Sequence, residues 1–565
     1  MTTGKDNEPG KQTKSPEAQE YLAQEKQEKE HYIRHLLRDF KTGWENFSRA
    51  DVLSDEKNIS LLLSVLRRKF NTKIEFLYGY PNFAAIKMDL SEVKIRLSVN
   101  TLVCFIRIDE KSGATTSEAF RHLTTSHYAD GIPGYTTIAL AHGDTGELKK
   151  RCKNALQDSV ILSSNLLEEV ISADLWVETL AEILREDRDA DILSPYDEIG
   201  VCSPELFIGR AKEMAKLTSH ARGHGYCLVG PRRVGKSSLL LRIKNYYSKI
   251  NQLTFYIDCQ TCYSGETLYE EIVKRTNPRD LKNRHLWSLK GYLIRLAGTL
   301  RGPVNLFLDE IDRVVADDKK SDYQLMRELL SAEATEKIPF KLWMVGFKDL
   351  YKAVTGRTGP LFGKTRGIDL GPLSTAETER LVMQPMTHMG FTFDNGKKAI
   401  RRIYEETSGH PAFIQLYCRL LVDEMVAKGA RKIKTKHLDA VYGHKDLQNY
   451  LKDTFVKSTS PLEKIIVLSV LDRNHFTQQE IYESLQQKYN IELRYEPLYD
   501  ELQDLRLTGV FRQKDGSFTF QYPVMKKIIK EYENPRYIEA ENIEDAREIA
   551  RRINERSKKN IREGQ

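Results

Sequence analysis

A glycine-rich segment near the middle of the chain constrains the fold more than any other. Residues 230 to 237 read GPRRVGKS and match G-x-x-x-x-G-K-[ST] without a gap. The apolar YCLV before them predicts a buried strand, and SSLLLRIKNYY after them predicts an amphipathic helix. The turn therefore lies at a helix N-terminus, where unpaired backbone N–H groups and the positive end of the helix dipole attract phosphate. This pattern predicts an α/β domain that binds a nucleotide.

The residues of this loop divide the expected contacts among them. The Lys236 ammonium would reach the β- and γ-phosphates, and the Ser237 hydroxyl would coordinate Mg2+. The two arginines of the loop either contact phosphate or face solvent. The nucleotide-binding residues predicted here are Gly230, Pro231, Arg232, Arg233, Val234, Gly235, Lys236, Ser237 and Ser238.

A phosphate loop calls for a later strand that ends in an acid, and VNLFLDE supplies one. Residues 304 to 308 are largely apolar, and Asp309 and Glu310 follow them. Asp309 would hold the Mg2+ together with Ser237. Glu310 is placed to orient and deprotonate an attacking water, which hydrolysis requires and binding alone does not. The predicted ligand is therefore ATP with Mg2+, hydrolysed to ADP, with Glu310 and Lys236 as the catalytic residues.

Several segments in a fixed order resemble one family. FIGRAKEMAKL, GPRRVGKSSLL, LFLDEID, KLWMVG, IDLGPLSTAETERLV and SGHPAFIQLYCRLL are similar to the STAND class of signal-transduction ATPases, and especially to archaeal-type ATPases related to AAA+ and origin-recognition proteins. The resemblance covers about residues 207 to 532. It implies a P-loop ATPase core of the ASCE type, a helical lid and a winged helix. It also implies contacts with adenine from the Phe-x-Gly-Arg segment and with the nucleotide from the Gly-x-Pro turn of the lid, which adds Phe207, Gly209, Arg210, His410 and Pro411.

Two features of that family are displaced here. The sensor strand would end at Val345 and Gly346, but Phe347 and Lys348 follow it where an arginine or asparagine is expected. Arg366 is placed to act as an arginine finger toward a neighbouring subunit, although a solvated basic loop is the favoured interpretation.

The length of 565 residues implies several separate cores. The fold class we expect is α/β: a P-loop ASCE ATPase domain with helical lid and winged helix, preceded by a separate restriction-endonuclease-like α/β domain. The predicted segments are a disordered charged tail or solvated helix (1–30), the N-terminal α/β domain (31–188), a linker (189–206), the ATPase core (207–372), the lid (373–459), the winged helix (460–532) and a solvated or fraying charged tail (533–565).

Composition excludes some classes of function. A net charge of +7 is small beside 87 basic and 80 acidic residues, so charge alone does not indicate nucleic-acid binding. Seven cysteines over this length form no disulfide framework, and Cys259 with Cys262 is a single CxxC that we take as incidental. No apolar run reaches transmembrane length, so we expect a cytoplasmic protein without a membrane partner.

The region of residues 460 to 532 has the pattern of a winged helix. Three helical segments precede VFRQKDGSFTFQY, a hairpin with Asp515 and Gly516 in its turn. A DNA-reading third helix needs basic residues and amides, but this one carries Glu496, Asp500, Glu501 and Asp504 against Arg506. We therefore expect it to pack on the ATPase or on a protein partner, as in the STAND class, where a winged helix holds the ADP state closed.

The N-terminal domain loosely resembles Mrr-like nuclease folds. Its expected strands include KIRLSV (94–99), and its expected helices include one long helix over residues 165 to 186. Nuclease chemistry needs an acid and a Glu-x-Lys on adjacent strands. Glu92 and Lys94 lie on too early a strand with Asp89 too close, while Asp109, Glu110 and Lys111 fall beyond the strand that should carry them. We expect a degenerate nuclease fold with a recognition or regulatory role.

Three functions stay open at this point. The first is a regulatory ATPase that acts as a nucleotide-dependent switch, with a homo-oligomer or a protein partner. The second is an initiator-like or loader-like ATPase that binds DNA, which the acidic helix disfavours. The third is an ATPase-controlled nuclease that acts in defence against foreign DNA, which the misplaced Glu-x-Lys disfavours.

Overall fold

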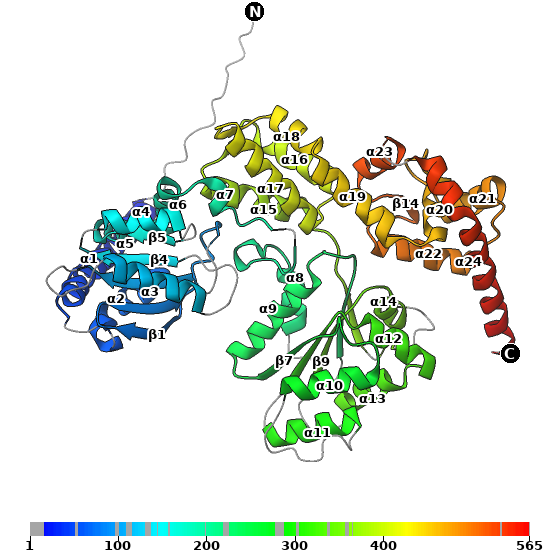
Figure 1. Ribbon diagram of the computed structural model, residues 1–565, viewed down its shortest axis with the longest axis horizontal. Coiled ribbons are helices and arrows are strands. Elements are labelled where there is room, and N and C mark those ends of the chain that lie inside the picture. The colour runs from blue at the N-terminus through cyan, green and yellow to red at the C-terminus, as the bar shows by residue number, and fades with distance from the viewer. Residues whose placement is uncertain are drawn as a thin grey trace, which may run out of the picture. The chain divides into compact units, whose positions relative to one another are not determined.

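The chain forms two compact units, which are described separately. One comprises residues 1–195 with 385–390, and the other comprises residues 196–384 with 391–565. The computed structural model (Figure 1) describes residues 16–50, 53, 55–96, 101–108, 116–129, 137–143, 145–155, 159–197, 199–218, 225–276, 288–300, 304–335, 340–355, 361–363, 365–531 and 534–563.

The first unit is a five-stranded mixed sheet between layers of helices. Its strands lie in the order β1-β2-β3-β4-β5, antiparallel from β1 to β3 and parallel from β3 to β5. The elements are α1 (Pro16–Arg49), α2 (Ser60–Phe70), β1 (Ile74–Tyr80), β2 (Phe83–Met88), β3 (Thr101–Arg107), α3 (Thr116–Ala129), β4 (Thr137–His142), α4 (Gly146–Ala155), β5 (Ser159–Leu162), α5 (Ser164–Ser172), α6 (Trp176–Asp187) and α7 (Ala190–Leu193).

The central strand β3 is buried on both faces of this sheet. Its residues Cys104 and Ile106 share a core with Ala119 and Leu123 of α3 and with Leu148 of α4. On the other face, the ring of Phe105 lies 5.8 Å from the ring of Phe47 of α1. A continuously apolar strand such as this one is typical of a sheet covered on both sides.

The strand expected at residues 94 to 99 is wrong for 94–96. Residues 91–96 form turns and bends, in which the Val93 amide donates to Leu90 O at 3.1 Å and the Arg96 amide donates to Leu193 O at 2.9 Å. Val93 and Ile95 are nevertheless fully buried. The alternating apolar pattern therefore indicates which side chains are buried, but these residues do not pair as a strand. Residues 97–99 lie outside the described part of the chain.

The helices of this unit also differ from expectation at two places. The long helix expected over residues 165 to 186 is interrupted at Ala173, whose backbone is extended, so that α5 and α6 pack against each other. Helix α1 begins at Pro16 and exposes residues 23–32, so over residues 16–30 the expected disordered tail is wrong and the alternative, a solvated helix, agrees with the structure. Residues 1–15 lie outside the described range.

The second unit is built on a five-stranded parallel sheet with the order β10-β6-β9-β8-β7. Strand β9 lies between β6, which leads into the GPRRVGKS loop, and β8, which ends at Asp309. The elements of this part are α8 (Ala211–Thr218), β6 (Gly225–Val229), α9 (Lys236–Lys249), β7 (Leu253–Asp258), α10 (Gly265–Thr276), α11 (Leu289–Leu300), β8 (Val304–Asp309), α12 (Asp312–Asp318), α13 (Gln324–Thr335), β9 (Phe340–Val345), α14 (Lys348–Thr355) and β10 (Thr365–Asp369).

Helices cover both faces of this sheet. Leu239 and Ile243 of α9 pack with Trp343 of β9 on one face. Leu268 of α10 and Leu350 of α14 belong to the core on the other face. Because the strands are parallel, their carboxyl ends meet at one edge of the sheet, and this is the edge where open α/β sheets bind their ligands.

A helical region and a C-terminal subdomain follow the sheet (Figure 1). The helical region contains α15 (Thr375–His388), β11 (Thr392–Phe393), α16 (Gly396–Thr407), α17 (Pro411–Ala427), β12 (Lys432–Ile433), α18 (Thr435–Tyr442) and α19 (Lys445–Ser458). The C-terminal subdomain contains α20 (Pro461–Ser469), α21 (Gln478–Tyr489), α22 (Tyr495–Leu507), β13 (Phe511–Lys514), β14 (Ser517–Phe520), α23 (Pro523–Glu531) and α24 (Pro535–Glu563). Its hairpin turns at Asp515 and Gly516, both with positive φ, as a type I′ turn requires.

The last helix corrects the expectation of a solvated or fraying tail at 533–565. Helix α24 packs along α20 and buries Ile538, Asn542, Ala546 and Ala550, which recur every four residues on one face. The spacing matches a helical stripe, which the many charges on the other faces obscure in the sequence. Across the described residues, no helix is both long enough and apolar enough to span a membrane.

Candidate functional site

Two glycines shape the loop between β6 and α9. Gly230 has a φ of +139°, and a Cβ there would lie 2.5 Å from the backbone oxygen of Leu370. Gly235 has a φ of +96° and occupies the N-cap of α9. Because a glycine offers no side chain to cap the helix, the first amides of α9 stay available to an anion.

Lys236 is buried at the first position of α9. Its Nζ donates to the backbone oxygens of Gly230 at 3.1 Å and Pro231 at 2.8 Å. Burial lowers the pKa of this ammonium, while Glu310 and other acids nearby oppose that shift. The ammonium is thus held over the loop, where a phosphate could replace the two carbonyl oxygens as its partner.

Two acids stand at the end of β8, on the edge of the sheet next to the loop. Asp309 is 2% exposed, and its Oδ2 accepts a hydrogen bond of 2.8 Å from the Tyr256 hydroxyl. Glu310 is more accessible and has a φ of +54°. Burial raises the pKa of both carboxyls, and Lys236 partly offsets this for Glu310.

The oxygens around Asp309 suit a magnesium ion. Ser237 lies close enough to lower the pKa of this carboxyl through its hydroxyl, and Asp258 of β7 is the neighbour of Asp309 in the parallel register. No group of three or more His, Cys, Asp or Glu side chains that could hold a metal occurs among the described residues. Mg2+ does not require one, because it is commonly bound by one or two carboxylates together with phosphate oxygens and water.

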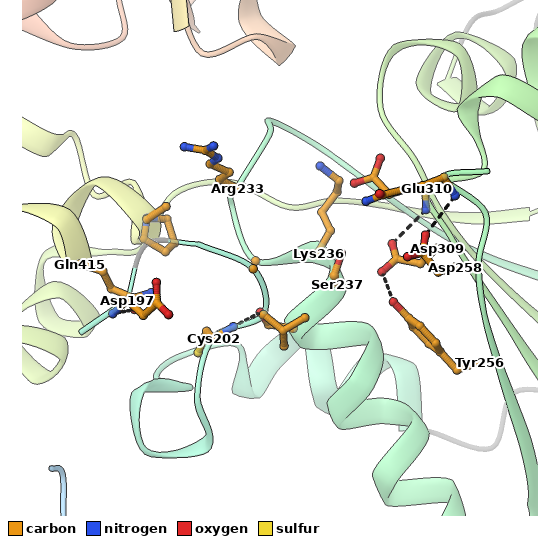
Figure 2. Close-up of a pocket in the computed structure, with 17 residues that line it drawn as sticks. Asp197, Cys202, Arg233, Lys236, Ser237, Tyr256, Asp258, Asp309, Glu310 and Gln415 are labelled. Carbon is orange, nitrogen blue, oxygen red and sulfur yellow. Dashed lines mark hydrogen bonds between the residues drawn. The ribbon is translucent and has the colours of Figure 1, made fainter. Parts of the chain in front are cut away.

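These side chains open into one cavity of about 380 Å³ (Figure 2). Its lining combines the loop, the acids and the first turn of α17. The lining residues are Asp197, Gly200, Val201, Cys202, Arg233, Gly235, Lys236, Ser237, Ser238, Tyr256, Asp258, Gln260, Asp309, Glu310, Pro411, Ala412 and Gln415.

The structure brings about half of the predicted site residues into this lining. Both predicted catalytic residues and both predicted magnesium ligands are among them, with Arg233, Gly235, Ser238 and Pro411. Gly230 and Pro231 take part through their backbone oxygens, which hold Lys236. Arg232 and Val234 do not line the cavity. The Arg232 guanidinium instead lies 5.0 Å from the centre of the Phe347 ring.

The Phe-x-Gly-Arg segment lies beside the cavity and not in its lining. Phe207 and Arg210 border a small adjoining pocket that shares Ser238 and Pro411 with it. The Arg210 guanidinium donates to the backbone oxygens of Val234 and Gly371, at 3.1 and 2.7 Å. Gly209 has a φ of +83°, and a Cβ on it would meet the Glu377 carboxylate at 2.6 Å. This segment therefore positions the loop from behind.

Three other predicted positions have definite places. The His410 ring bonds through Nε2 to the backbone oxygen of Arg232 at 2.9 Å. Arg366 lies on β10 with its side chain exposed, so the expected basic loop is a strand at this point. Lys348, after the expected sensor strand, pairs with acids of the C-terminal subdomain and does not line the cavity.

Sequence reasoning missed several residues of the cavity. Tyr256 and Asp258 belong to β7, and the rule that ligands bind at the carboxyl ends of parallel strands would have indicated them. Asp197 and Cys202 come from the segment expected to be a linker, and Gln415 lies one turn into α17. No local motif marks these three, since only the tertiary fold brings them to the loop.

The parallel sheet, the loop at a helix N-terminus and the two acids at the end of β8 define a P-loop nucleotide-binding fold. Residues 220–354 match the family model described as an AAA domain. The predicted α/β class with a P-loop core is therefore confirmed, and residues 220–354 are hereafter called the AAA domain because of their similarity to this family model.

Solved structures similar to the chain come from several organisms. The Walker-type ATPase of Pyrococcus abyssi is 18% identical, with 59% of this chain and 99% of that chain covered and a TM-score of 0.46. The ORC2 protein of Aeropyrum pernix, in ADPNP–ADP complexes, is 14% identical, with 59% and 94% covered and a TM-score of 0.41. The RuvB Holliday junction branch migration motor of Thermotoga maritima is 15% identical, with 57% and 95% covered and a TM-score of 0.31. No curated protein matches the sequence.

Proposed function

We propose that the protein is a regulatory ATPase, which binds ATP with Mg2+, hydrolyses it and uses the bound nucleotide as a switch. The AAA domain and the cavity at its P-loop support nucleotide binding. The second acid, Glu310, supports hydrolysis, because water needs a base within reach to attack a phosphate. The protein would work in the cytoplasm, with a second copy or another protein as partner.

Four side chains of the cavity have distinct parts in this proposal. The amides at the start of α9 and the Lys236 ammonium bind and orient the phosphates. Ser237 and Asp309 would hold the Mg2+, which supplies neutralising charge at the phosphate oxygens when it is bound. Glu310 accepts a proton from the attacking water, and its pKa, raised by burial, brings it closer to neutral pH as a base needs.

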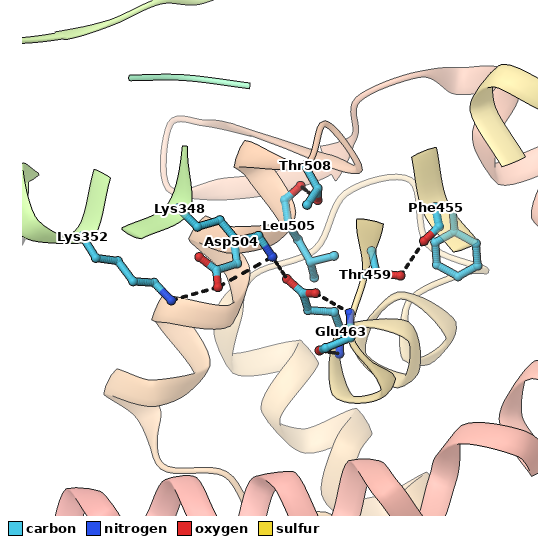
Figure 3. Close-up of polar contacts among 9 residues, drawn as sticks. Lys348, Lys352, Phe455, Thr459, Glu463, Asp504, Leu505 and Thr508 are labelled. Atoms are coloured by element: carbon cyan, nitrogen blue, oxygen red, sulfur yellow. Dashed lines mark hydrogen bonds and ion pairs between the residues drawn. The ribbon is translucent and has the colours of Figure 1, made fainter. Parts of the chain in front are cut away.

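The observation that supports a switch is a set of ion pairs between the AAA domain and the C-terminal subdomain (Figure 3). Lys348 Nζ lies 2.8 Å from Glu463 Oε1, and Lys352 Nζ lies 2.8 Å from Asp504 Oδ2. Both acids are buried. Removing one partner of such a pair strongly destabilises a protein, because the other charge would be left buried without a partner. Asp504 of the acidic helix α22 and Glu463 of α20 are thus paired with the AAA domain.

Helix α14 connects these ion pairs to the nucleotide cavity. The Asp312 carboxylate, two residues beyond Glu310, accepts hydrogen bonds from the amides of Phe347, Asp349 and Leu350 at 2.5, 3.0 and 3.3 Å. It therefore holds the N-terminus of the helix that carries Lys348 and Lys352. A change at the acids of β8 on binding of ATP would reach the C-terminal subdomain through this helix.

A charge swap tests the switch. Lys352→Glu should loosen the C-terminal subdomain and speed ADP release several-fold, and Lys352→Glu with Asp504→Lys should restore the original rate. Lys320→Glu is the matched control, because Lys320 pairs only locally, with Asp317. Stopped-flow release of a fluorescent ADP analogue gives the rates. Equal release from folded Lys352→Glu and from the control would contradict the proposal.

Two further measurements bear on the proposal as a whole. Lys236→Ala should abolish ATP turnover, and retained turnover would remove the central claim. Sizing of the full chain with ADP and with a non-hydrolysable ATP analogue, each with and without DNA, should show a change in mass or hydrodynamic radius. Nucleotides shift two states only by their different affinities for them, so an unchanged size in every condition would speak against a switch.

DNA binding is the second candidate, favoured by one observation. Strand β13 exposes Arg512, Gln513 and Lys514, although the acidic α22 disfavours a phosphate backbone. Lys514→Glu should then weaken DNA binding and flatten its dependence on salt.

For the N-terminal unit we propose a regulatory role without DNA cleavage, because Glu92 and Lys94 lie in a bend after β2 and not on a strand.

A further inference from the structure

A second cavity, of about 300 Å³, adjoins the P-loop and shares Arg233 with the first. Its volume is at the lower end of the range for small-molecule sites. Three parts of the chain form its walls: the P-loop, the helical region and the C-terminal subdomain. The lining residues are Arg232, Arg233, His410, Tyr450, Asp453, Thr454, Lys457, Ser458, Thr508 and Tyr522.

The charges on these walls favour an anion. Lys457 pairs with Asp453 at 2.7 Å, which leaves the guanidinium groups of Arg232 and Arg233 as excess positive charge. These two groups lie over the rings of Phe347 and Tyr450, at 5.0 and 5.3 Å from the ring centres. In the described part of the chain, neither has a carboxylate within ion-pair distance. A guanidinium bound only to an aromatic face keeps its N–H groups for phosphate.

His410 adds an unsatisfied acceptor to the same wall. It is 5% exposed, and its Nε2 must donate to the Arg232 carbonyl, which can only accept. Burial lowers the pKa of the ring to about 4, so the imidazole is neutral and Nδ1 carries no proton. In the described structure Nδ1 has no hydrogen-bond partner. Because Nδ1 itself has almost no exposed surface, a ligand hydroxyl would satisfy it only after the ring turns toward the cavity.

We propose that this second cavity binds a phosphorylated, hydroxyl-rich small molecule, such as a sugar phosphate or a nucleoside monophosphate. Its phosphate pairs with Arg232 and Arg233, while Lys457 neutralises Asp453 on the same wall, and one of its hydroxyls donates to His410 Nδ1 once the ring has turned. The hydroxyls of Thr454 and Thr508 donate to the backbone oxygens of Tyr450 and Leu505, so their oxygens remain as acceptors for further hydroxyls of the ligand. Hydroxyl recognition distinguishes this ligand class from a bare inorganic anion.

The ligand would act as an effector of the switch, and this part of the inference rests on the proposed function. It touches the P-loop, the helical region and the C-terminal subdomain together, so it favours the state in which the three are in contact. Arg233 lines both cavities. Binding in one must therefore alter affinity in the other, and the coupling is reciprocal.

Calorimetry on the full chain tests the site. With the first cavity saturated by ADP and Mg2+, the protein is titrated with ribose 5-phosphate, AMP and inorganic phosphate. We expect ribose 5-phosphate or AMP to bind once per chain, with a Kd of about 1 mM or tighter, and inorganic phosphate to bind about tenfold more weakly. Lys457→Ala should weaken the organic phosphates about tenfold. Lys445→Ala, on the same helix but outside the cavity, should change their affinity less than twofold.

Three results would overturn the inference: no binding of any probe up to 10 mM, equal effects of Lys457→Ala and Lys445→Ala, or inorganic phosphate bound as tightly as ribose 5-phosphate. Failure of the proposed function is distinguishable. Loss of ADP binding itself would reject the nucleotide site, and titration of the nucleotide-free protein would still test the second cavity. The organic probe that binds more tightly identifies the sugar phosphate or the nucleotide as the source of the phosphate.

Discussion

Glu310 combines a functional position with an unusual backbone. Its φ of +54° places a residue with a side chain in the left-handed region, which non-glycine residues enter infrequently. Neighbouring hydrogen bonds hold it there, since the Glu310 amide donates to Asp309 Oδ1 at 3.0 Å. Such strain concentrates at functional sites, where it aims a side chain. At Glu310 it directs the carboxylate to the cavity edge next to Lys236.

The substitution Glu310→Gln separates binding from chemistry. It keeps the shape of the side chain but removes the base, so ATP turnover should fall by about 10²- to 10⁴-fold. The affinity for ADP should change little, because the amide still fits the cavity. Phosphate release and ADP titration measure the two effects. Turnover within threefold of the native rate would exclude Glu310 as the base.

Some residues of the site could be predicted from local sequence, whereas others are brought there only by the tertiary fold. Lys236, Ser237, Asp309 and Glu310 were predicted, because local chain geometry alone sets their places, at a helix start and at a strand end. Tyr256 could have been predicted from the same rule, applied to the neighbouring strand. Asp197 and Gln415 could not, since their approach to the loop depends on tertiary packing that no periodicity records.

Helix α22 has a titration of its own. Burial, together with Glu463 and Asp504 nearby, raises the pKa of Glu501 to about 7, although Lys352 and Lys348 oppose the shift. Between about pH 4.5, its ordinary value, and pH 7 the folded protein binds more protons than the unfolded chain. The contribution of Glu501 to the free energy of unfolding therefore decreases as the pH rises from about 4.5 to 7. Above pH 7 this contribution no longer changes with pH.

Glu501→Gln should remove this dependence. At pH 8 the variant should be more stable than the native protein by about 1–3 kcal/mol, and at pH 4.5 the two should be equal. Glu496→Gln, at an exposed position of the same helix, is the control. Urea unfolding across this pH range gives the values. A native stability that rises between pH 5 and 7 in step with the variant would contradict the assignment.

Helix α24 shows why some elements resist prediction. Its charged residues dominate its composition, whereas its packing depends on a stripe of four residues against α20. The strand expected at residues 94 to 99 is wrong over 94–96 for the opposite reason: its apolar residues are buried as the alternation indicates, but the Arg96 amide bonds to Leu193 O instead of to a neighbouring strand. The hairpin at Asp515 and Gly516 was predicted correctly, because its turn chemistry is local.

Truncation of the stripe tests the packing of α24. Ile538→Ala removes a side chain that is 6% exposed, so it should destabilise the C-terminal subdomain by about 2–4 kcal/mol. Glu541→Ala, on an exposed face of the same helix, should cost less than about 0.5 kcal/mol. Thermal unfolding compares the two. Equal midpoints for both variants would show that α24 is solvated after all.

At the scale of the whole molecule, the AAA domain can be assigned a chemistry more readily than the N-terminal unit. The full chain with Mg2+ or Mn2+ should leave duplex and single-stranded DNA intact, because its Glu-x-Lys lies in a bend. Gel electrophoresis of labelled DNA is sufficient. Metal-dependent cutting that Glu92→Gln or Glu110→Gln abolishes would establish a nuclease instead; Glu110 lies outside the described residues.

The strand order of the parallel sheet also governs when the site can form during synthesis. Within the described residues, strand β6, which leads into the P-loop, pairs with β9 and β10 and with no other strand, and both lie far later in the chain. The backbone N–H and C=O groups of β6 can form their strand hydrogen bonds only after residues 340–345 and 365–369 have been synthesised. Contacts so distant in sequence form slowly and leave strand edges exposed meanwhile. A nascent chain that ends before β9 should therefore lack a formed P-loop and bind no nucleotide.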